Sequence, residues 1–189
     1  MNILDIKKPI WFMRQAGRHL PEYRKIRLKK ENFLDFCFDK ESVVEATLQP
    51  IQRYNIDSAI IFCDILIVPY ILGQKISFVK GEGPLLESLS LKELINLKPL
   101  YQKEKDLENT YDAIKDVRKK LNKNKSLIGF CGGPWTVACY MINGKGDTKF
   151  RIATEKMKQQ KAALVKLLDK LVDLSVIHLY QQYISGCDT

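Results

Sequence analysis

Two arginines near the beginning of the chain are spaced so that they could act together. Arg14 and Arg18 lie four residues apart in the stretch MRQAGRHLPEYR, where Gly17 and Pro21 favour a loop or short turn as much as a helix. A guanidinium binds a carboxylate bidentately and keeps its charge at physiological pH, so a close pair suits a ligand with several carboxylates. The alternative is that both are surface charges, or partners of nearby acids such as Glu22.

An aspartate follows the first apolar run that has the character of a buried strand. Asp64 comes directly after SAIIFC, so its carboxylate should be partly withdrawn from water at the end of a sheet. A buried anion is costly unless donors converge on it. The position therefore predicts a ligand rich in N–H groups or a role in proton transfer. The alternative is that Asp64 is the N-cap of the next helix, ILIVPYIL.

A tyrosine and a glycine-rich turn follow the second strand-like run. Tyr140 lies on the helix expected after FCGGPW, and its phenol could donate a hydrogen bond to a developing charge. The alternative is an ordinary packed residue of an amphipathic helix. The turn could present backbone N–H groups to a ligand, but it lacks the full phosphate-loop pattern.

The histidines and cysteines predict no metal centre. His19 falls inside the arginine segment and could touch an acidic ligand, whereas His178 is expected to be a packing or surface residue of the last helix. The five cysteines are scattered and contain no C-x-x-C pair, so we interpret them as free thiols, mostly packed in the core. Because His, Cys and carboxylate residues do not cluster, no metal site is expected.

The elements that must position these residues alternate as in an α/β protein. We expect helices over 21–54, 91–97 and 105–121, and two helices within 147–183. We expect strands at 58–62 and from 126 into the Gly132-Gly133 turn, after which Pro134 begins a helix. A short strand from 75 should end in a loop at Gly81, Gly83 and Pro84. This order predicts a parallel sheet. Such sheets place functional groups at the carboxyl ends of their strands, where Asp64 and the Gly132-Gly133 turn both fall.

Composition and length limit the class of protein. The chain has 189 residues, is 46% hydrophobic and carries a formal net charge of +9, which favours an anionic partner such as a nucleic acid or a polycarboxylate. We find no recognition helix, RNP-type aromatic pair or zinc finger, so no nucleic-acid partner is expected. The beginning does not resemble a signal peptide and no apolar run approaches the roughly 20 residues of a membrane span, so we expect a cytoplasmic protein with no membrane partner.

A (β/α)8 barrel typically needs about 250 residues. With Gly186 ending a helix where another strand should begin, we expect the chain to stop in mid-fold.

Three sequence blocks resemble one enzyme family. PIWFMRQAGRHLPEYR at 9–24, IIFCDILIVPYILGQKISFVKGEGP at 60–84 and GFCGGPWTVACYMINGKG at 129–146 are similar, in order, to conserved blocks of the uroporphyrinogen decarboxylase family. The resemblance implies that residues 1–189 are the N-terminal part of a single TIM-barrel domain, the first half of a (β/α)8 barrel that is apparently truncated. It also implies a cytoplasmic enzyme, usually a homodimer, that removes the four acetate carboxyl groups of uroporphyrinogen III to give coproporphyrinogen III in haem biosynthesis, without metal or organic cofactor.

The resemblance also implies a role for each candidate residue. Arg14 and Arg18 correspond to arginines that hold substrate carboxylates, and the residues between them, Gln15, Ala16 and Gly17, belong to the same substrate-binding segment. Asp64 corresponds to the aspartate that accepts the pyrrole N–H groups and stabilises the protonated pyrrole from which carbon dioxide leaves. Tyr140 corresponds to a tyrosine that contacts the substrate near that aspartate.

The sequence also departs from the family pattern. His19 stands where the family usually has Tyr, Cys63 stands where Ser is common, and a later substrate-contacting serine and a C-terminal histidine have no counterpart. We therefore expect the chain alone to be inactive or poorly folded. Alternatives are a non-functional remnant of a split gene, a basic binding module, or a related barrel methyltransferase, which would need a zinc-binding Cys/His set that is absent.

Overall fold

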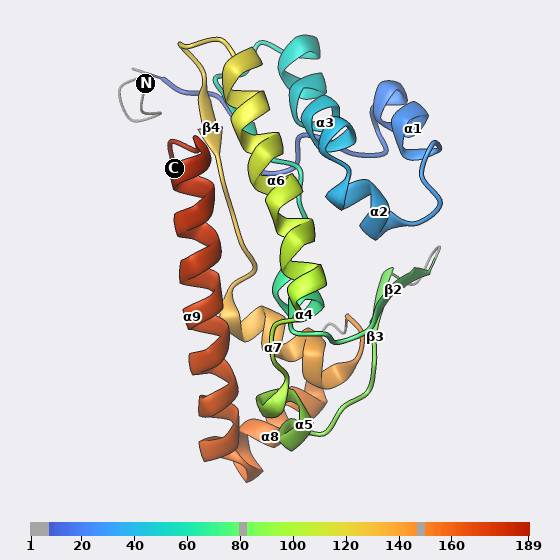
Figure 1. The fold of residues 1–189 in the computed structure, drawn as a ribbon, viewed down its shortest axis with the longest axis vertical. Coiled ribbons are helices and arrows are strands. Elements are labelled where there is room, and N and C mark those ends of the chain that lie inside the picture. Colours follow the sequence, from blue (N-terminus) through green and yellow to red (C-terminus); the bar gives the residue numbers. More distant parts are fainter. Residues whose placement is uncertain (1–7, 80–82, 147–149) are drawn as a thin grey trace. The chain divides into compact units, whose positions relative to one another are not determined.

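The computed structural model describes residues 8–79, 83–146 and 150–189 (Figure 1). Its helices and strands, in chain order, are α1 (Pro21–Arg27), α2 (Phe33–Phe38), α3 (Lys40–Arg53), β1 (Ser58–Ile60), α4 (Ile67–Ile71), β2 (Ile76–Val79), β3 (Gly83–Leu86), α5 (Leu91–Asn96), α6 (Tyr101–Lys120), β4 (Ser126–Ile128), α7 (Pro134–Asn143), α8 (Arg151–Gln159) and α9 (Lys161–Ser185). They form two compact units. The first contains residues 8–63, 105–130 and 179–189, and the second contains the described residues of 64–104 and 131–178.

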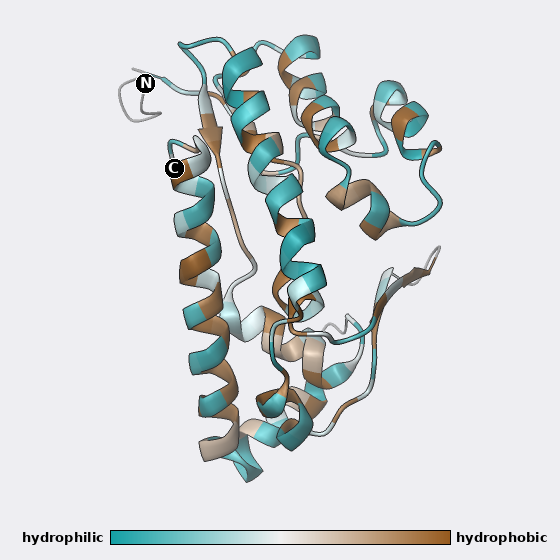
Figure 2. Ribbon diagram, in the orientation of Figure 1, coloured by the Kyte–Doolittle hydropathy of each residue, from teal (hydrophilic) through white to brown (hydrophobic). Residues whose placement is uncertain are grey.

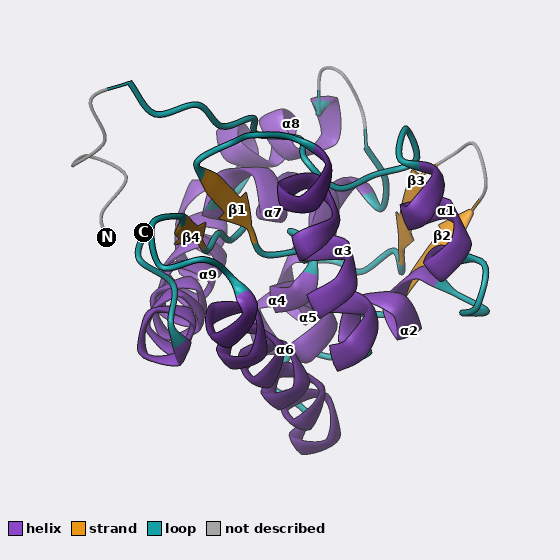
Figure 3. Ribbon diagram, turned by 90° about the horizontal axis from the view of Figure 1, so that it is seen from above, coloured by secondary structure: helices purple, strands orange, loops and turns teal. Residues whose placement is uncertain are grey.

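A parallel pair of strands lies at the centre of the first unit. β1 and β4 pair in register from Ser58↔Ser126 to Ile60↔Ile128, and Ile61 N donates to Ile128 O at 3.0 Å (Figure 3). Helices α3 and α6 pack on this pair, and the shared core contains Val43, Val44, Leu48, Ala59, Ile61, Ala113, Ile114, Val117, Leu121, Leu127 and Cys187. The mixed α/β class and the parallel pairing of the two predicted strands are confirmed.

Local capping explains where α2 and α3 begin. Asn32 and Asp39 are the N-caps of α2 and α3, and their side chains accept the N–H groups of Asp35 and Ser42. Pro50 lies in the last turn of α3 without ending it earlier. Thr47, fully buried on α3, accepts the N–H of Phe62 at 2.9 Å, so α3 fixes the chain two residues before Asp64.

The second unit contains a strand that the sequence did not predict. Residues 83–86 pair antiparallel with β2, Val79 opposite Gly83 and Phe78 opposite Pro84, so the expected loop at Gly83 and Pro84 is wrong. Proline is tolerated here because an edge strand need not donate every N–H, and Gly83 supplies a φ of +83°. The expected break at Gly81 lies outside the described residues.

Hydrogen bonds from two polar side chains join elements of the second unit. Gln74, fully buried, donates from Nε2 to Glu87 O at 2.9 Å and to Met141 O at 3.1 Å, which joins the β2–β3 hairpin to the end of α7. Lys170 on α9 donates to Ile95 O in the last turn of α5 and to the carbonyl of its C-cap residue, Leu97. The two helices expected within 147–183 are confirmed as α8 and α9. Among the described residues, no helix has the length and apolar character that a membrane crossing requires.

Candidate active site

The arginine segment is a turn rather than a helix. Residues 13–19 have no regular secondary structure, and Leu20 N closes a turn by donating to Gly17 O at 3.0 Å before Pro21 begins α1. Arg14 and Arg18 are both exposed, while the residue next to Arg14, Gln15, is only 6% exposed. The segment therefore presents its two guanidinium groups to solvent from a buried anchor.

That anchor is the side-chain amide of Gln15. Its Nε2 donates to Ser58 O at 2.7 Å and its Oε1 accepts Ile60 N at 3.0 Å. These two bonds reproduce the pattern that a neighbouring strand would make with β1. Sequence reasoning assigned Gln15 to substrate binding, but its amide is already used by the protein's own backbone. No local sequence signal distinguishes the two uses, because the partner lies more than 40 residues away.

The acid that could have neutralised the arginines has another partner. Glu22 accepts Nε and Nη2 of Arg53 at 2.7 and 3.0 Å, and this bidentate pair holds the pKa of Glu22 at about 2. In the described part of the chain, neither Arg14 nor Arg18 forms an ion pair. The alternative that they are partners of Glu22 is wrong.

Asp64 lies in a half-buried turn between β1 and α4. Its Oδ1 accepts Leu66 N at 2.8 Å, and α4 begins only at Ile67, so Asp64 shapes the turn before the helix rather than acting as the N-cap. Burial raises the pKa of the Asp64 carboxyl, and the bond from Leu66 opposes this rise. A carboxyl group in this environment favours additional hydrogen-bond donors when it ionises.

The turn after β4 packs directly against the turn that contains Asp64. A Cβ atom at Gly132 would lie 2.8 Å from Ile65 O, 3.0 Å from Ile65 Cβ and 2.5 Å from Val137 Cγ2. Only glycine fits at this contact. At the neighbouring Gly133, the N-cap of α7, nothing lies within 4 Å. The two turns after the predicted parallel strands are therefore in contact within the second unit.

Tyr140 lies half-buried on α7. Its ring packs edge-on against Phe150 with centroids 5.6 Å apart, and a Cβ at Gly146 would come within 3.3 Å of its hydroxyl. Tyr140 and Asp64 belong to the second unit, whereas Arg14, Gln15, Ala16, Gly17 and Arg18 belong to the first. The roles assigned to these residues stay predictions.

The two histidines lie in different environments. His178 is 3% exposed, and burial lowers its pKa to about 4, so it is neutral at pH 7 and packs in the fold as expected. His19 is exposed on the arginine segment. Across residues 8–79, 83–146 and 150–189, no three His, Cys, Asp or Glu side chains are close enough to share a metal ion.

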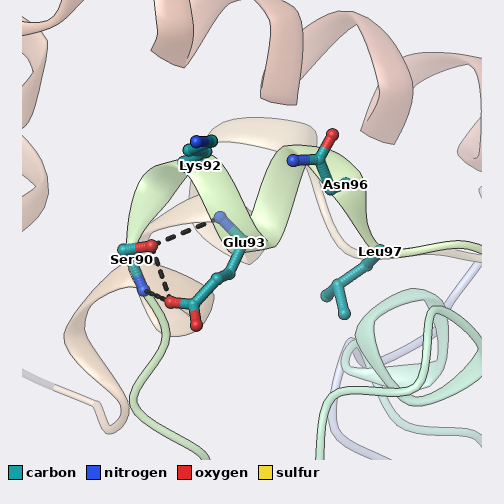
Figure 4. A pocket seen from close by; sticks show the side chains of 5 residues that line it. All are labelled: Ser90, Lys92, Glu93, Asn96 and Leu97. Carbon is teal, nitrogen blue, oxygen red and sulfur yellow. Dashed lines mark hydrogen bonds between the residues drawn. The ribbon is translucent and has the colours of Figure 1, made fainter.

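A surface hollow at α5 is lined by none of the predicted site residues, and the polar groups of Ser90 and Glu93 in its lining already have hydrogen-bond partners. It measures about 530 Å³ and is lined by Ser90, Lys92, Glu93, Asn96 and Leu97 of α5 and its ends (Figure 4). Ser90 and Glu93 form a capping box in which each side chain bonds the other residue's N–H. These polar groups are satisfied by starting the helix.

Comparison with known proteins identifies a family. A family model described as uroporphyrinogen decarboxylase matches residues 6–189. The chain is 45% identical over 186 residues to the uroporphyrinogen decarboxylase of Rickettsia bellii, with 98% of this chain and 54% of the relative aligned, and 46% identical over 183 residues to that of Rickettsia canadensis. The chain thus spans about half the length of the curated relatives it matches. A solved methyltransferase from Methanosarcina mazei has a similar fold, with a TM-score of 0.71, 15% identity, and 97% of this chain and 53% of that one covered.

Proposed function

Because the chain belongs to the uroporphyrinogen decarboxylase family, we propose that it supplies the N-terminal portion of an enzyme that converts uroporphyrinogen III to coproporphyrinogen III. In this proposal residues 1–189 are the first half of a (β/α)8 barrel and one part of a single domain. Support comes from the parallel β1–β4 pair, from the match over residues 6–189, and from relatives about twice as long.

The observation that carries the proposal is the environment of Asp64. Its carboxyl is half-buried rather than turned into bulk solvent, its pKa is raised by burial, and it accepts the N–H of Leu66. A tetrapyrrole offers pyrrole N–H groups that would favour the ionised form and bring this pKa down again. Loss of carbon dioxide needs an electron sink, and a protonated pyrrole provides one. The fixed anion of Asp64 would stabilise that cation as the bond breaks.

The proposal also assigns roles to the arginine segment and to Tyr140. The exposed guanidinium groups of Arg14 and Arg18 would bind substrate carboxylates, which suits the acidity of uroporphyrinogen. The backbone of Ala16 and Gly17 would lie along the substrate, and Tyr140 would donate a hydrogen bond from its phenol. Because the protonated pyrrole is the electron sink, the proposed reaction requires no metal or organic cofactor.

Complementation tests the proposal. The chain would be co-expressed with the polypeptide that carries the unmatched half of the Rickettsia bellii relative, and coproporphyrinogen formation would be measured. We expect activity that Asp64→Asn lowers by about 10²- to 10³-fold. Asp112→Asn, which removes an exposed carboxylate that pairs with Lys115 on the same helix, is the matched control and should keep full activity.

Activity that is unchanged by Asp64→Asn would contradict the proposed site. No activity together with an aggregated chain would favour a non-functional remnant, and stoichiometric zinc in the purified protein would favour a methyltransferase. The proposal extends to a homodimer of the complete enzyme and to a cytoplasmic location, which sedimentation of the assembled protein and cell fractionation would test.

A further inference from the structure

Phe150 is an unusual residue for the beginning of a helix. It occupies the N-cap position of α8, where Ser, Thr, Asp or Asn usually supplies a hydrogen-bond acceptor, and its side chain makes no capping bond. Its backbone has a φ of 41° and a ψ of 49°, and among the described residues it is the one non-glycine residue with a positive φ. A bulky residue in this left-handed region is strained, and such strain persists only where the surroundings fix it. Starting the helix does not explain this choice of residue.

Another residue supplies the missing cap of α8. The side chain of Asn143, at the end of α7, accepts the N–H of Ala153 with its Oδ1 at 3.1 Å. Phe150 O accepts hydrogen bonds from Thr154 N and Thr154 Oγ1, both at 3.0 Å. α8 is mostly polar, whereas α7 is mostly apolar (Figure 2), and Ala153 in the first turn is the buried residue of α8. The ring of Phe150 is thus not needed for capping and is available for packing.

That ring packs against Tyr140. The two ring centroids are 5.6 Å apart at an interplanar angle of 64°, an edge-on geometry that stabilises an aromatic pair beyond the area it buries. A Cβ added at Gly146 would lie 3.3 Å from both the hydroxyl oxygen and Cε1 of Tyr140. A side chain at residue 146 would therefore press on the phenol, and glycine leaves room for it. The phenol is contacted by the Phe150 ring and lies close to the backbone at residue 146.

The chain that follows Tyr140 is itself fixed. Gly144 ends α7 with a φ of +74°, donates its N–H to Tyr140 O at 2.9 Å, and accepts Leu86 N at 2.7 Å. Lys145 forms an antiparallel bridge with Leu85, so this segment continues the β2–β3 hairpin beside β3. These bonds do not involve the Tyr140 side chain. The surroundings of the phenol are therefore set by the backbone of the second unit.

We propose that Phe150 is a positioning residue for Tyr140. Its ring restricts the phenol to one orientation, and the strained backbone of Phe150 is kept because it brings that ring into contact. The Tyr140 hydroxyl then has a fixed place from which it can donate a hydrogen bond to a substrate. A leucine at residue 150 would leave the phenol free to reach other staggered rotamers. The use of the hydroxyl rests on the proposed function, whereas the placement of the ring does not.

Steady-state kinetics of the complemented enzyme test this role. Tyr140→Phe should lower kcat about tenfold, as the loss of one hydrogen bond predicts. Phe150→Leu should lower kcat about three- to tenfold and change KM by less than about twofold, and Phe150→Tyr, which keeps the ring, should restore kcat. In the Tyr140→Phe background, Phe150→Leu should have no further effect on kcat, whereas a general loss of structure would lower kcat again. Phe38→Leu makes the same change at a half-buried phenylalanine of α2 and is the matched control.

Fluorine NMR tests the placement of the ring without measuring catalysis. The chain would be labelled with 3-fluorotyrosine and mixed with its unlabelled partner polypeptide, and the Tyr140 resonance would be identified by its loss in Tyr140→Phe. We expect Phe150→Leu to shift this resonance, because the neighbouring ring is gone, and Phe38→Leu to leave it in place.

Two results would overturn the inference. One is an unshifted Tyr140 resonance in Phe150→Leu, and the other is a fall in kcat from Phe150→Leu that is equally large in the Tyr140→Phe background. Full activity of Tyr140→Phe together with a shifted resonance in Phe150→Leu would contradict the proposed role of Tyr140 in the reaction. That combination would still support its placement by Phe150.

Discussion

Replacing Gly132 by alanine tests the contact between the two turns that follow β1 and β4. The added methyl group would lie 2.5 Å from Val137 Cγ2 and 2.8 Å from Ile65 O. Val137 is β-branched and 1% exposed, and Ile65 O belongs to the backbone, so neither atom can move without displacing its surroundings. The turn next to Asp64 must shift.

Overpacking of this kind costs about 1–3 kcal/mol. Two overlaps with stiff partners place Gly132→Ala at the upper end, and 3 kcal/mol corresponds to a fall in Tm of about 6–12 °C for a chain of this size. Gly133→Ala is the matched control, because nothing lies within 4 Å and φ is −59°. At Gly133, alanine is a weaker N-cap, which lowers the stability of the folded state, but it also makes the unfolded chain less flexible, which raises stability. These two effects are similar in size, so we expect little change in Tm.

Thermal and urea unfolding of the two variants and the wild type provide the measurement. The double variant Gly132→Ala, Val137→Ala should lose less stability than the sum of the single variants, because removing Cγ2 removes the closest overlap. Equal loss of stability in Gly132→Ala and Gly133→Ala would refute the steric reasoning. Additive losses in the double variant would refute the role of Val137.

Three further changes test other buried contacts. Gln15→Glu should lower the free energy of unfolding by about 1–3 kcal/mol at pH 7, because a carboxylate would face Ser58 O. The loss should shrink towards pH 4, where the protonated acid can donate a hydrogen bond. Urea unfolding at both pH values would compare this variant with Gln52→Glu, which changes an exposed residue. Burial lowers the pKa of His178 from its usual 6.5 to about 4, so the unfolded chain takes up a proton at a higher pH than the folded chain does. The free energy of unfolding should therefore fall by up to about 3 kcal/mol as the pH is lowered from 6.5 to 4. Thermal unfolding of His178→Gln over this pH range should show a weaker pH dependence than the wild type. Lys170→Met should lower the free energy of unfolding by about 1–2 kcal/mol, because it leaves carbonyls at the end of α5 unpaired. Amide hydrogen exchange in α5 should become faster, and a rate equal to that of the wild type would contradict the role of Lys170.

Local signals in the sequence were sufficient for most of the elements. The β-branched run before Asp64 and the run before Gly132 became paired parallel strands, and Pro134 occupies the first turn of α7. Each of these features is decided within a few residues, through backbone sterics and the burial of an apolar run. The strand at Gly83 and Pro84 was missed because both residues usually interrupt strands, whereas an antiparallel hairpin edge accommodates them.

The contacts that define the candidate site were beyond local reasoning. Asp64 and its half-buried position followed from the strand before it, but its bond to Leu66 depends on where α4 begins. The use of the Gln15 amide by β1 and the contact of Gly132 with Ile65 join residues 43 or more positions apart. Residue type alone does not specify such partners.

The Gln15 side chain has a consequence for solubility. An uncovered strand edge is a template on which other chains can add strands and aggregate. On β1 the outward Ser58 O and Ile60 N are already occupied by a single amide, and on β4 the outward groups of Leu127 and Gly129 are occupied by residues 188 and 189. In the isolated chain these four backbone groups are already paired, so they offer no template to another copy, and on β1 a side chain occupies the place of a strand.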